Sequence, residues 1–265
     1  MVPHTLEAPM AEHHFHTPDP VQLNAENSSG RVRVTASEST ETRVTVTGRH
    51  ADEVEVVQHG REIRVAPPRR RTGFFGGDDS LDIHVALPVG SDLAIRTGSA
   101  DVVSAGPVGS AQVKTGSGDV DLEQVCEELQ VKCGSGDVRI GEAQAAVAVS
   151  TGSGDVEIGR NRGPAVVKTG SGDVRFREAT TEVSLMTGSG DLVLDTVRAG
   201  RFHAKGASGS IHVGIPAGTP VWTDITTLSG RIHSDVEGAG EPTEDADHVE
   251  LRASTVSGDV VLTQR

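Results

Sequence analysis

The amino-acid sequence predicts an all-β protein folded as a single-stranded parallel β-helix, a β-solenoid made of 18-residue coils. Two observations support this fold class. A glycine-rich motif recurs every 18 residues, and aliphatic or β-branched residues alternate with polar residues on both sides of it. Because each coil of a solenoid contacts only its neighbours, one elongated domain can accommodate all 265 residues.

The repeated motif is the tetrad Gly-Ser-Gly-Asp, with one Gly-Ser-Ala-Asp variant. These tetrads end, in steps of 18 residues, at Asp101, Asp119, Asp137, Asp155, Asp173 and Asp191. Looser Ser-Gly motifs extend the pattern to Ser29, Ser208, Ser229 and Ser257. Since glycine and β-branched residues both disfavour a helix, we expect short strands joined at tight Gly-Ser-Gly corners.

Residues 18 positions apart share their chemistry, which predicts that like side chains stack on like. Four columns of apolar residues or threonine are expected to point inward, and they are headed by Val113, Thr115, Val120 and Leu122. Lys114 and Asp121 lie between these positions and are expected to point outward. Coils would then stack at about 4.8 Å, the spacing of paired strands. We expect the solenoid to be right-handed and three-sided.

The repeat divides the chain into segments of different regularity. The expected segments are an N-terminal tail or first strand (1–20), irregular β coils that form a cap (21–97), regular coils (98–194), and looser C-terminal coils with a cap (195–265). Terminal repeats of solenoids are atypical because they cover an open sheet edge. We expect the N-terminal region and the last strand, residues 258–262, to cap the ends and to leave a monomer or small oligomer.

Composition excludes several kinds of partner. A formal net charge of −14 argues against nucleic acid and anionic membranes. No apolar run reaches the roughly 18 residues of a membrane-spanning helix. Because the first residues are polar and carry no secretory signal, we expect a cytoplasmic protein in which Cys126 and Cys133 are reduced. Exposure on the cell surface would need a route that the sequence does not reveal.

Three further segments carry a family pattern. The pattern has three parts. The first is the repeated Thr-Gly-Ser-Gly-Asp-Val, and the second is Ile-Pro-Ala-Gly-Thr-Pro-Val-Trp at 215–222, followed by Thr-Leu-Ser-Gly at 227–230. The third is the closing Thr-Val-Ser-Gly-Asp-Val at 255–260. Together they resemble the bacterial DUF4097 family of β-strand-repeat proteins, labelled candidate adhesins, in its soluble actinobacterial form. The resemblance covers roughly residues 15–265. It implies a β-repeat fold, and its adhesin label is itself an inference from the repeats.

The aspartate column (Asp101, Asp119, Asp137, Asp155, Asp173 and Asp191) is the candidate site. Two interpretations compete. Each aspartate could cap its turn by accepting backbone N–H groups, or the carboxylates could form a surface ladder that binds calcium or a cationic partner. Calcium-binding β-rolls use G-G-x-G-x-D-x-U-x, whereas here the aspartate directly follows the second glycine and occurs once per coil. Capping is therefore the favoured interpretation, and no metal or cofactor is expected.

The remaining chemical candidates favour structural roles. His13, His14 and His16 fit a polar strand or tail better than a rigid metal site. Cys133 occupies the threonine column and is expected to be a small buried residue. The arginines at 69–71 are expected in a solvated loop, since Pro, Gly and charged residues predict loops at 67–79 and 237–247.

No residues indicate catalysis. Coils 98–194 carry no insertion that could wall a cleft, and Asp224, His212 and His233 lie scattered without a nucleophile motif. We therefore predict a non-catalytic binding or structural module that engages a protein, a cell-envelope component or another copy of itself. The alternatives are a cation-binding aspartate ladder and a β-helix carbohydrate-active enzyme, lyase or hydrolase. An aromatic content of 2% argues against the enzyme, which would need stacking platforms for sugars.

Overall fold

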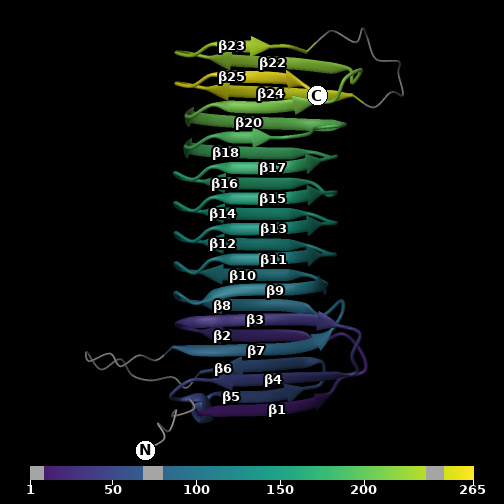
Figure 1. Cartoon of the computed structure of the whole chain (residues 1–265), viewed down its shortest axis with the longest axis vertical. Coiled ribbons are helices and arrows are strands. Elements are labelled where there is room, and N and C mark those ends of the chain that lie inside the picture. Colours follow the sequence, from purple (N-terminus) through teal and green to yellow (C-terminus); the bar gives the residue numbers. More distant parts are fainter. Residues whose placement is uncertain (1–8, 68–79, 237–247) are drawn as a thin grey trace, which may run out of the picture.

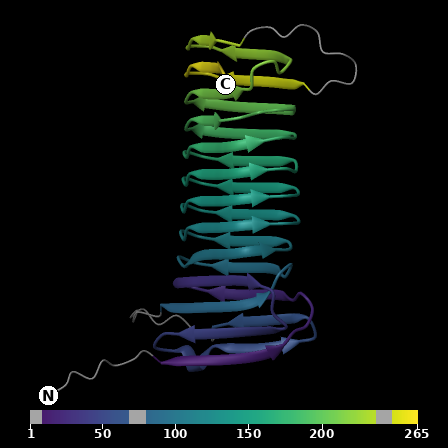
Figure 2. The ribbon, with the colours of Figure 1, turned by 45° about the vertical axis from the view of Figure 1, so that its right-hand side comes forward.

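The computed structural model describes residues 9–67, 80–236 and 248–265. Within them the chain forms two long sheets that face each other and enclose an aliphatic core (Figures 1 and 2). Sheet A has 13 strands and sheet B has 12. The predicted β-solenoid is confirmed.

The regular coils contribute one strand to each sheet. Their strands are β8 (Asp92–Thr97), β9 (Asp101–Val108), β10 (Ala111–Thr115), β11 (Val120–Val125), β12 (Leu129–Cys133), β13 (Val138–Ala143), β14 (Val147–Thr151), β15 (Val156–Asn161), β16 (Ala165–Thr169), β17 (Val174–Ala179), β18 (Val183–Ser189) and β19 (Leu192–Leu194). Odd-numbered strands lie in sheet A and even-numbered strands in sheet B. Each pairs in parallel with the equivalent strand of the next coil, so Val120 lies beside Val138 and Val113 beside Val131.

The inward columns agree with the sequence. Val113, Val120 and Leu122 are fully buried and Thr115 is 8% exposed. Lys114 is half-buried on the outer face and Asp121 is exposed. A further inward column, which the sequence analysis did not separate, lines the corner opposite the Gly-Ser-Gly corner. It consists of Val108, Val125, Ala143, Asn161, Ala179 and Val197.

The coil has two faces, whereas the sequence predicted three. Strands such as β11 and β12 have 6 and 5 residues, and the rest of the 18-residue period forms the two short corners. No residues remain for a third strand. The described residues include one short 3₁₀ helix, η1 (Ala51–Glu53), and none of their helices could cross a membrane.

The N-terminal end is closed by strands that change direction. It contains β1 (Met10–His16), β2 (Gln22–Asn27), β3 (Gly30–Ser37), β4 (Glu41–Thr47), β5 (Glu55–His59), β6 (Glu62–Ala66) and β7 (Leu81–Pro88). β2 and β3 stack in parallel on β8 and β9, as another coil would. Beyond them, β1 with β4, β4 with β7, and β5 with β6 are antiparallel. This end thus departs from the parallel stacking of the regular coils, and of the three antiparallel pairs only β5 and β6 are consecutive strands.

The C-terminal coils follow an order that differs from the sequence. Their strands are β20 (Gly200–Ser208), β21 (Ile211–Ile215), β22 (Val221–Thr227), β23 (Ile232–Ser234), β24 (Val249–Thr255) and β25 (Val260–Gln264). β24 lies between β20 and β22, and β25 lies between β21 and β23. Figure 1 shows the C-terminus inside the stack, beneath β22 and β23. The prediction that residues 258–262 form the terminal cap is wrong, since residues 221–234 hold that place.

The terminal coil is adapted to lie at the end. Thr223 and Ser234 occupy the inward register positions held by Leu251 and Leu262 in the coil beneath. Both are exposed, whereas the two leucines are buried. These two polar residues reduce the apolar area that the open end presents to water, whereas Ile232, at the inward position beside Val260, is 52% exposed.

The register makes a direct prediction about Val156, which is 1% exposed in the middle of the stack. Val156→Asp should lower the free energy of unfolding by several kcal/mol, because a buried carboxylate has no partner there. Lys168→Asp, on the outer face of sheet B, is the control and should leave thermal stability nearly unchanged. Equal melting temperatures for the two variants would contradict the register.

Candidate functional site

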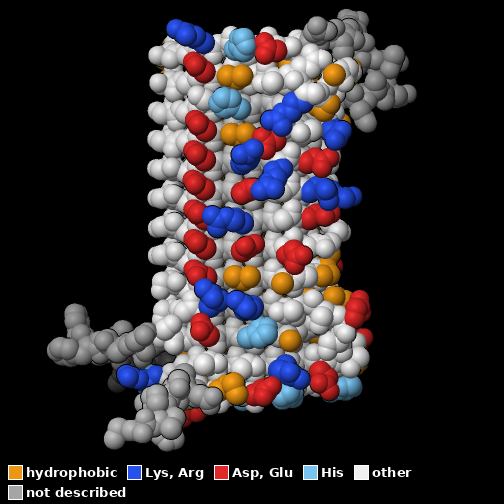
Figure 3. All heavy atoms as spheres, in the orientation of Figure 1, with side chains coloured by type: hydrophobic (Ala, Val, Ile, Leu, Met, Phe, Trp, Pro, Cys, Tyr) orange, Lys and Arg blue, Asp and Glu red, His pale blue; other side chains and the backbone are white. Residues whose placement is uncertain are grey.

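The aspartate column runs up one border of sheet A, beside the Gly-Ser-Gly corner. In Figure 3 its carboxylates form a straight red line along the rod. Each carboxylate accepts a hydrogen bond from the backbone N–H of the aspartate in the next coil. The Asp137, Asp155 and Asp173 N–H groups, for example, donate to Oδ1 of the aspartate one coil earlier at 2.9, 3.1 and 2.9 Å.

This bonding extends beyond the regular coils. The Ser210 N–H donates to Asp191 Oδ1 at 2.7 Å, and the Arg231 N–H donates to Asp259 Oδ1 at 2.8 Å. The second pair joins the interleaved terminal coils. Each aspartate therefore caps a backbone group, as one interpretation of the sequence held, but the donor lies in the neighbouring coil rather than in its own turn. The carboxylates therefore join neighbouring coils by hydrogen bonds.

The glycines of the corner are required by the closeness of the coils. A Cβ on the second glycine of each tetrad would overlap the carbonyl oxygen of the preceding coil, as at Gly154 over Gly136. None of these glycines has a positive φ; those lie elsewhere, for example at Gly106 and Gly218. The motif therefore selects glycine for its missing side chain and not for a left-handed backbone.

The buried threonine column completes the corner. Thr169 Oγ1 accepts a hydrogen bond from the Gly172 N–H at 3.0 Å and donates to the Gly154 carbonyl of the preceding coil at 3.4 Å. Cys133 takes the same place in its coil, where its Sγ accepts from the Gly136 N–H at 3.0 Å. It is 8% exposed, so the prediction that it is a small buried residue is confirmed.

Charged side chains on the rest of sheet A pair with one another. Arg160 bridges Glu142 and Glu178, one coil to either side, at 3.3 and 3.4 Å. Arg198 also bonds Glu178, at 3.0 Å, and this hydrogen bond lowers the pKa of the Glu178 carboxyl. Further pairs join Arg177 to Glu157, Arg175 to Asp195 and Arg139 to Asp137. Except for Arg139 and Asp137, which lie in one coil, these ion pairs cross from coil to coil.

The other candidate residues do not converge. His14 pairs with Glu12 at 3.1 Å on edge strand β1, and the described residues contain no group of three or more potential metal ligands. His212 and His233 lie on sheet A, whereas Asp224 lies on sheet B. Cys126 and Cys133 are both free thiols. The predicted loops at 67–79 and 237–247, with the arginines at 69–71, lie outside the described residues except for Pro67.

The hollows of the described surface are shallow and open to solvent. One of about 360 Å³ lies on sheet A above Gly141 and Gly159, bordered by Arg160 and Arg177. The arginines there are held by the ion pairs described above. Two others lie at opposite ends of sheet B. Each of the three is lined by both acidic and basic side chains, as where Asp224 lies with His203 and Lys205, and each is open enough to hold a surface ligand.

The closeness of the corners predicts how much stability is lost when a methyl group is added at Gly154. Gly154→Ala should destabilise the protein by roughly 1–3 kcal/mol or more, since the Gly136 carbonyl already fills the required space. Ser153→Ala, at the exposed neighbouring position, is the matched control and should change stability little. Denaturant unfolding measures both changes. A Gly154→Ala protein as stable as the Ser153→Ala control would refute close coil stacking.

The hydrogen bond between the Asp155 carboxylate and the Asp173 N–H predicts different changes in stability for two substitutions of Asp155. Asp155→Asn keeps an acceptor for the Asp173 N–H and should change stability by no more than about 0.5 kcal/mol. Asp155→Ala removes that acceptor and should cost about 1 kcal/mol. Millimolar calcium should leave the melting temperature of the unaltered protein nearly unchanged. A rise of several degrees that is lost in Asp155→Asn would instead support the cation-binding ladder.

Comparison with solved structures identifies the fold. A crystal structure of a candidate adhesin from Bacteroides fragilis is similar with a TM-score of 0.53 and 14% identity, over 96% of this chain and 97% of that one. A candidate adhesin from Parabacteroides merdae gives a TM-score of 0.47 and 17% identity, with coverage of 97% and 96%. A candidate lipid-binding protein from Parabacteroides distasonis gives 0.45 and 14%, with coverage of 97% and 96%.

Comparison with other proteins identifies the family of this chain but supplies no relative of curated function. Among proteins with curated functions, none matches this chain. The model of one protein family, described as Toastrack DUF4097, matches residues 22–263. The resemblance inferred from the Thr-Gly-Ser-Gly-Asp-Val repeats is therefore confirmed. Because the match spans nearly the whole chain, the protein belongs to the Toastrack DUF4097 family.

Proposed function

We propose that this protein is a non-catalytic binding module, adhesin-like or scaffolding in role, which engages a protein or a cell-envelope component through the outer faces of its sheets. The observation that carries the proposal is the arrangement of its surface. Outward side chains repeat coil after coil in straight columns, while the corners are fixed by hydrogen bonds between coils. Such a surface suits extended contacts better than the enclosure of a small substrate.

Rigidity supports this role. Sheet A has 13 strands, which at about 4.8 Å per strand make a rod of roughly 58 Å. Its outward residues are held in one register by parallel pairing on both sides. A rigid surface loses little conformational entropy when it binds, which favours extended contacts with modest individual strength.

The comparisons support the same proposal at the level of fold. The Bacteroides fragilis protein with the shared architecture is described as a candidate adhesin. At 14% identity the likeness extends to the fold alone, so the binding role of this chain is argued from its own surface.

We further propose that the protein acts as a monomer or small oligomer. The N-terminal end turns antiparallel, and the terminal C-terminal coil carries Thr223 and Ser234 at inward positions. Both features oppose the end-to-end stacking of coils that would build a filament.

The proposal is tested by capture from the native cell. The folded full-length chain, immobilised, should retain a saturable component from the envelope or soluble fraction without converting it, as judged by mass spectrometry of the eluate. The Val156→Asp variant serves as a control in which the folded surface is lost. Retention that is equal on both baits, or cleavage of a retained glycan, would contradict a folded non-catalytic binding surface.

A further inference from the structure

All four lysines of the chain lie in one outward column of sheet B. The sequence contains lysine only at Lys114, Lys132, Lys168 and Lys205. Strand pairing places them in register, since Lys114 pairs with Lys132, Ser150 separates Lys132 from Lys168, and Met186 separates Lys168 from Lys205. Arg96 precedes Lys114 in the same column. We call the positions from Arg96 to Lys205 the lysine column.

The lysine column is unpaired, in contrast with the charges of sheet A. Lys132, Lys168 and Lys205 are exposed and Lys114 is half-buried. Among the described residues, none of the four ammonium groups has an ion-pair or hydrogen-bond partner. On sheet A, arginines such as Arg160 and Arg198 are instead bound to carboxylates at 3.0–3.4 Å. Four arginines of the described residues, Arg33, Arg49, Arg64 and Arg231, also have no ion pair, but only the lysines share one outward column.

Small or amide side chains make up most of the two flanks of this line, and the aspartate column lies beyond the Gly-Ser-Gly corner. One flank is the Gly-Ser-Gly corner. The other is the next outward column, which consists of Ala94, Gln112, Gln130, Ala148, Val166, Ser184 and His203. In that column the Gln112 amide donates to Gln130 Oε1 at 3.0 Å, so its amides are aligned along the rod. A ligand on the lysines would meet amides and small side chains at its border.

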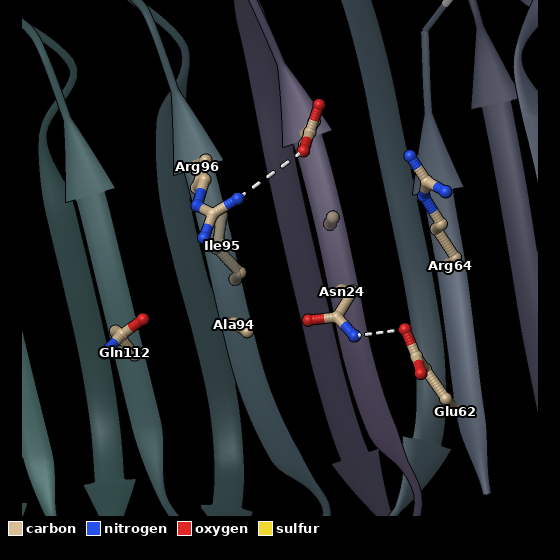
Figure 4. A pocket seen from close by; sticks show the side chains of 9 residues that line it. Asn24, Glu62, Arg64, Ala94, Ile95, Arg96 and Gln112 are labelled. Atoms are coloured by element: carbon tan, nitrogen blue, oxygen red, sulfur yellow. Dashed lines mark hydrogen bonds and ion pairs between the residues drawn. The ribbon is translucent and has the colours of Figure 1, made fainter.

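The line also runs between two hollows. At its N-terminal end a hollow of about 220 Å³ is bordered by Arg64, Arg96 and Gln112, and also by Glu26 and Glu62 (Figure 4). Arg96 is 3.8 Å from Glu26 there, a loose pair. At the other end, a hollow of about 320 Å³ is bordered by His203, Lys205 and Arg252, with Asp224 as its one acidic residue. From Arg96 to Lys205 the column crosses six coil steps, about 29 Å at the strand spacing.

From this arrangement we infer that the lysine column binds an acidic polysaccharide, laid along the rod with its carboxylate or phosphate groups against the ammonium groups. The inference rests on the proposed binding function and names the chemistry of the envelope component. Lysines in alternate coils are about 9.6 Å apart, a spacing comparable with the repeat of a disaccharide. The aligned amides of Gln112 and Gln130 can bond the hydroxyl groups of the sugars.

Three other polyanions fit less well. A peptide laid on the column would cross the strands at right angles, so it could not add to a sheet edge through its main chain. Single-stranded nucleic acid binds through stacked aromatic side chains, and neither this column nor its flanking outward column contains Phe, Tyr or Trp. A planar anionic membrane would also press on Glu128, Glu182 and Glu250 at the opposite border of sheet B.

The test uses the full-length protein and a fluorescein-labelled polygalacturonate oligosaccharide in an anisotropy titration. We expect binding that weakens as salt rises and a dissociation constant that increases roughly tenfold in the Lys132→Gln/Lys168→Gln double variant. The matched control is Arg139→Gln/Arg177→Gln, which removes the same charge from sheet A and should bind like the unaltered protein. An equal loss in both double variants would assign binding to net charge and overturn the inference.

Other probes and a second readout sharpen the result. Polyglutamate, oligothymidylate or phosphatidylserine vesicles that bind as tightly, with the same dependence on Lys132 and Lys168, would overturn the assignment to a polysaccharide. Amine acylation followed by mass spectrometry is selective here, because every lysine lies in the column; bound polygalacturonate should slow labelling of Lys132 and Lys168. If no polygalacturonate binds while the capture experiment still retains an envelope component, this inference fails and the proposed function stands.

Discussion

The structure depends on one contact that repeats up the rod, in which the carbonyl oxygen of one coil occupies the space that a Cβ would need on a glycine of the next. Gly136, Gly154 and Gly172 all make it. The contact lets successive corners stack at the spacing of paired strands, and the threonine hydroxyls and aspartate carboxylates then bond across that short gap. The same contact recurs where the spacing is not 18 residues, as at Gly209 over Gly190, so it belongs to the stacked corner and does not set the length of a coil.

Stacking in one register has an electrostatic consequence, because equal residues in successive coils place equal charges side by side. Neighbouring carboxylates at about 4.8 Å repel by about 0.9 kcal/mol in water, and by less in salt. In the aspartate column each carboxylate gains a backbone N–H, which offsets the repulsion. In the lysine column Ser150 and Met186 interrupt the series and space the later lysines two coils apart. Sheet A instead alternates sign, as at Glu142, Arg160 and Glu178.

The sequence predicted the features that depend on the exact 18-residue repeat. The columns of Val113 and Val120, and the burial of Cys133 among threonines, follow from positions 18 residues apart. The number of faces did not follow, because alternation identifies strands but not the angle at each corner. The position of β24 and β25 between earlier strands could not be predicted for a different reason. Coils of similar sequence can pair with one another in more than one order, and the sequence does not specify which order forms. The lysine column was partly visible, yet an extra residue between Met186 and Lys205 breaks the period, and only strand pairing shows that Lys205 belongs to it.

The central claim is that each coil is an interchangeable unit held by the same contacts, and removal of one coil tests it most directly. Deletion of residues 137–154 takes out one 18-residue period and rejoins Gly136 to Asp155, which restores the tetrad. Deletion of residues 138–154 leaves one residue too many at the corner. The account predicts that the first variant unfolds cooperatively, with a melting temperature near that of the full chain, and that the second is strongly destabilised, as followed by circular dichroism. Equal behaviour of the two deletions would contradict it.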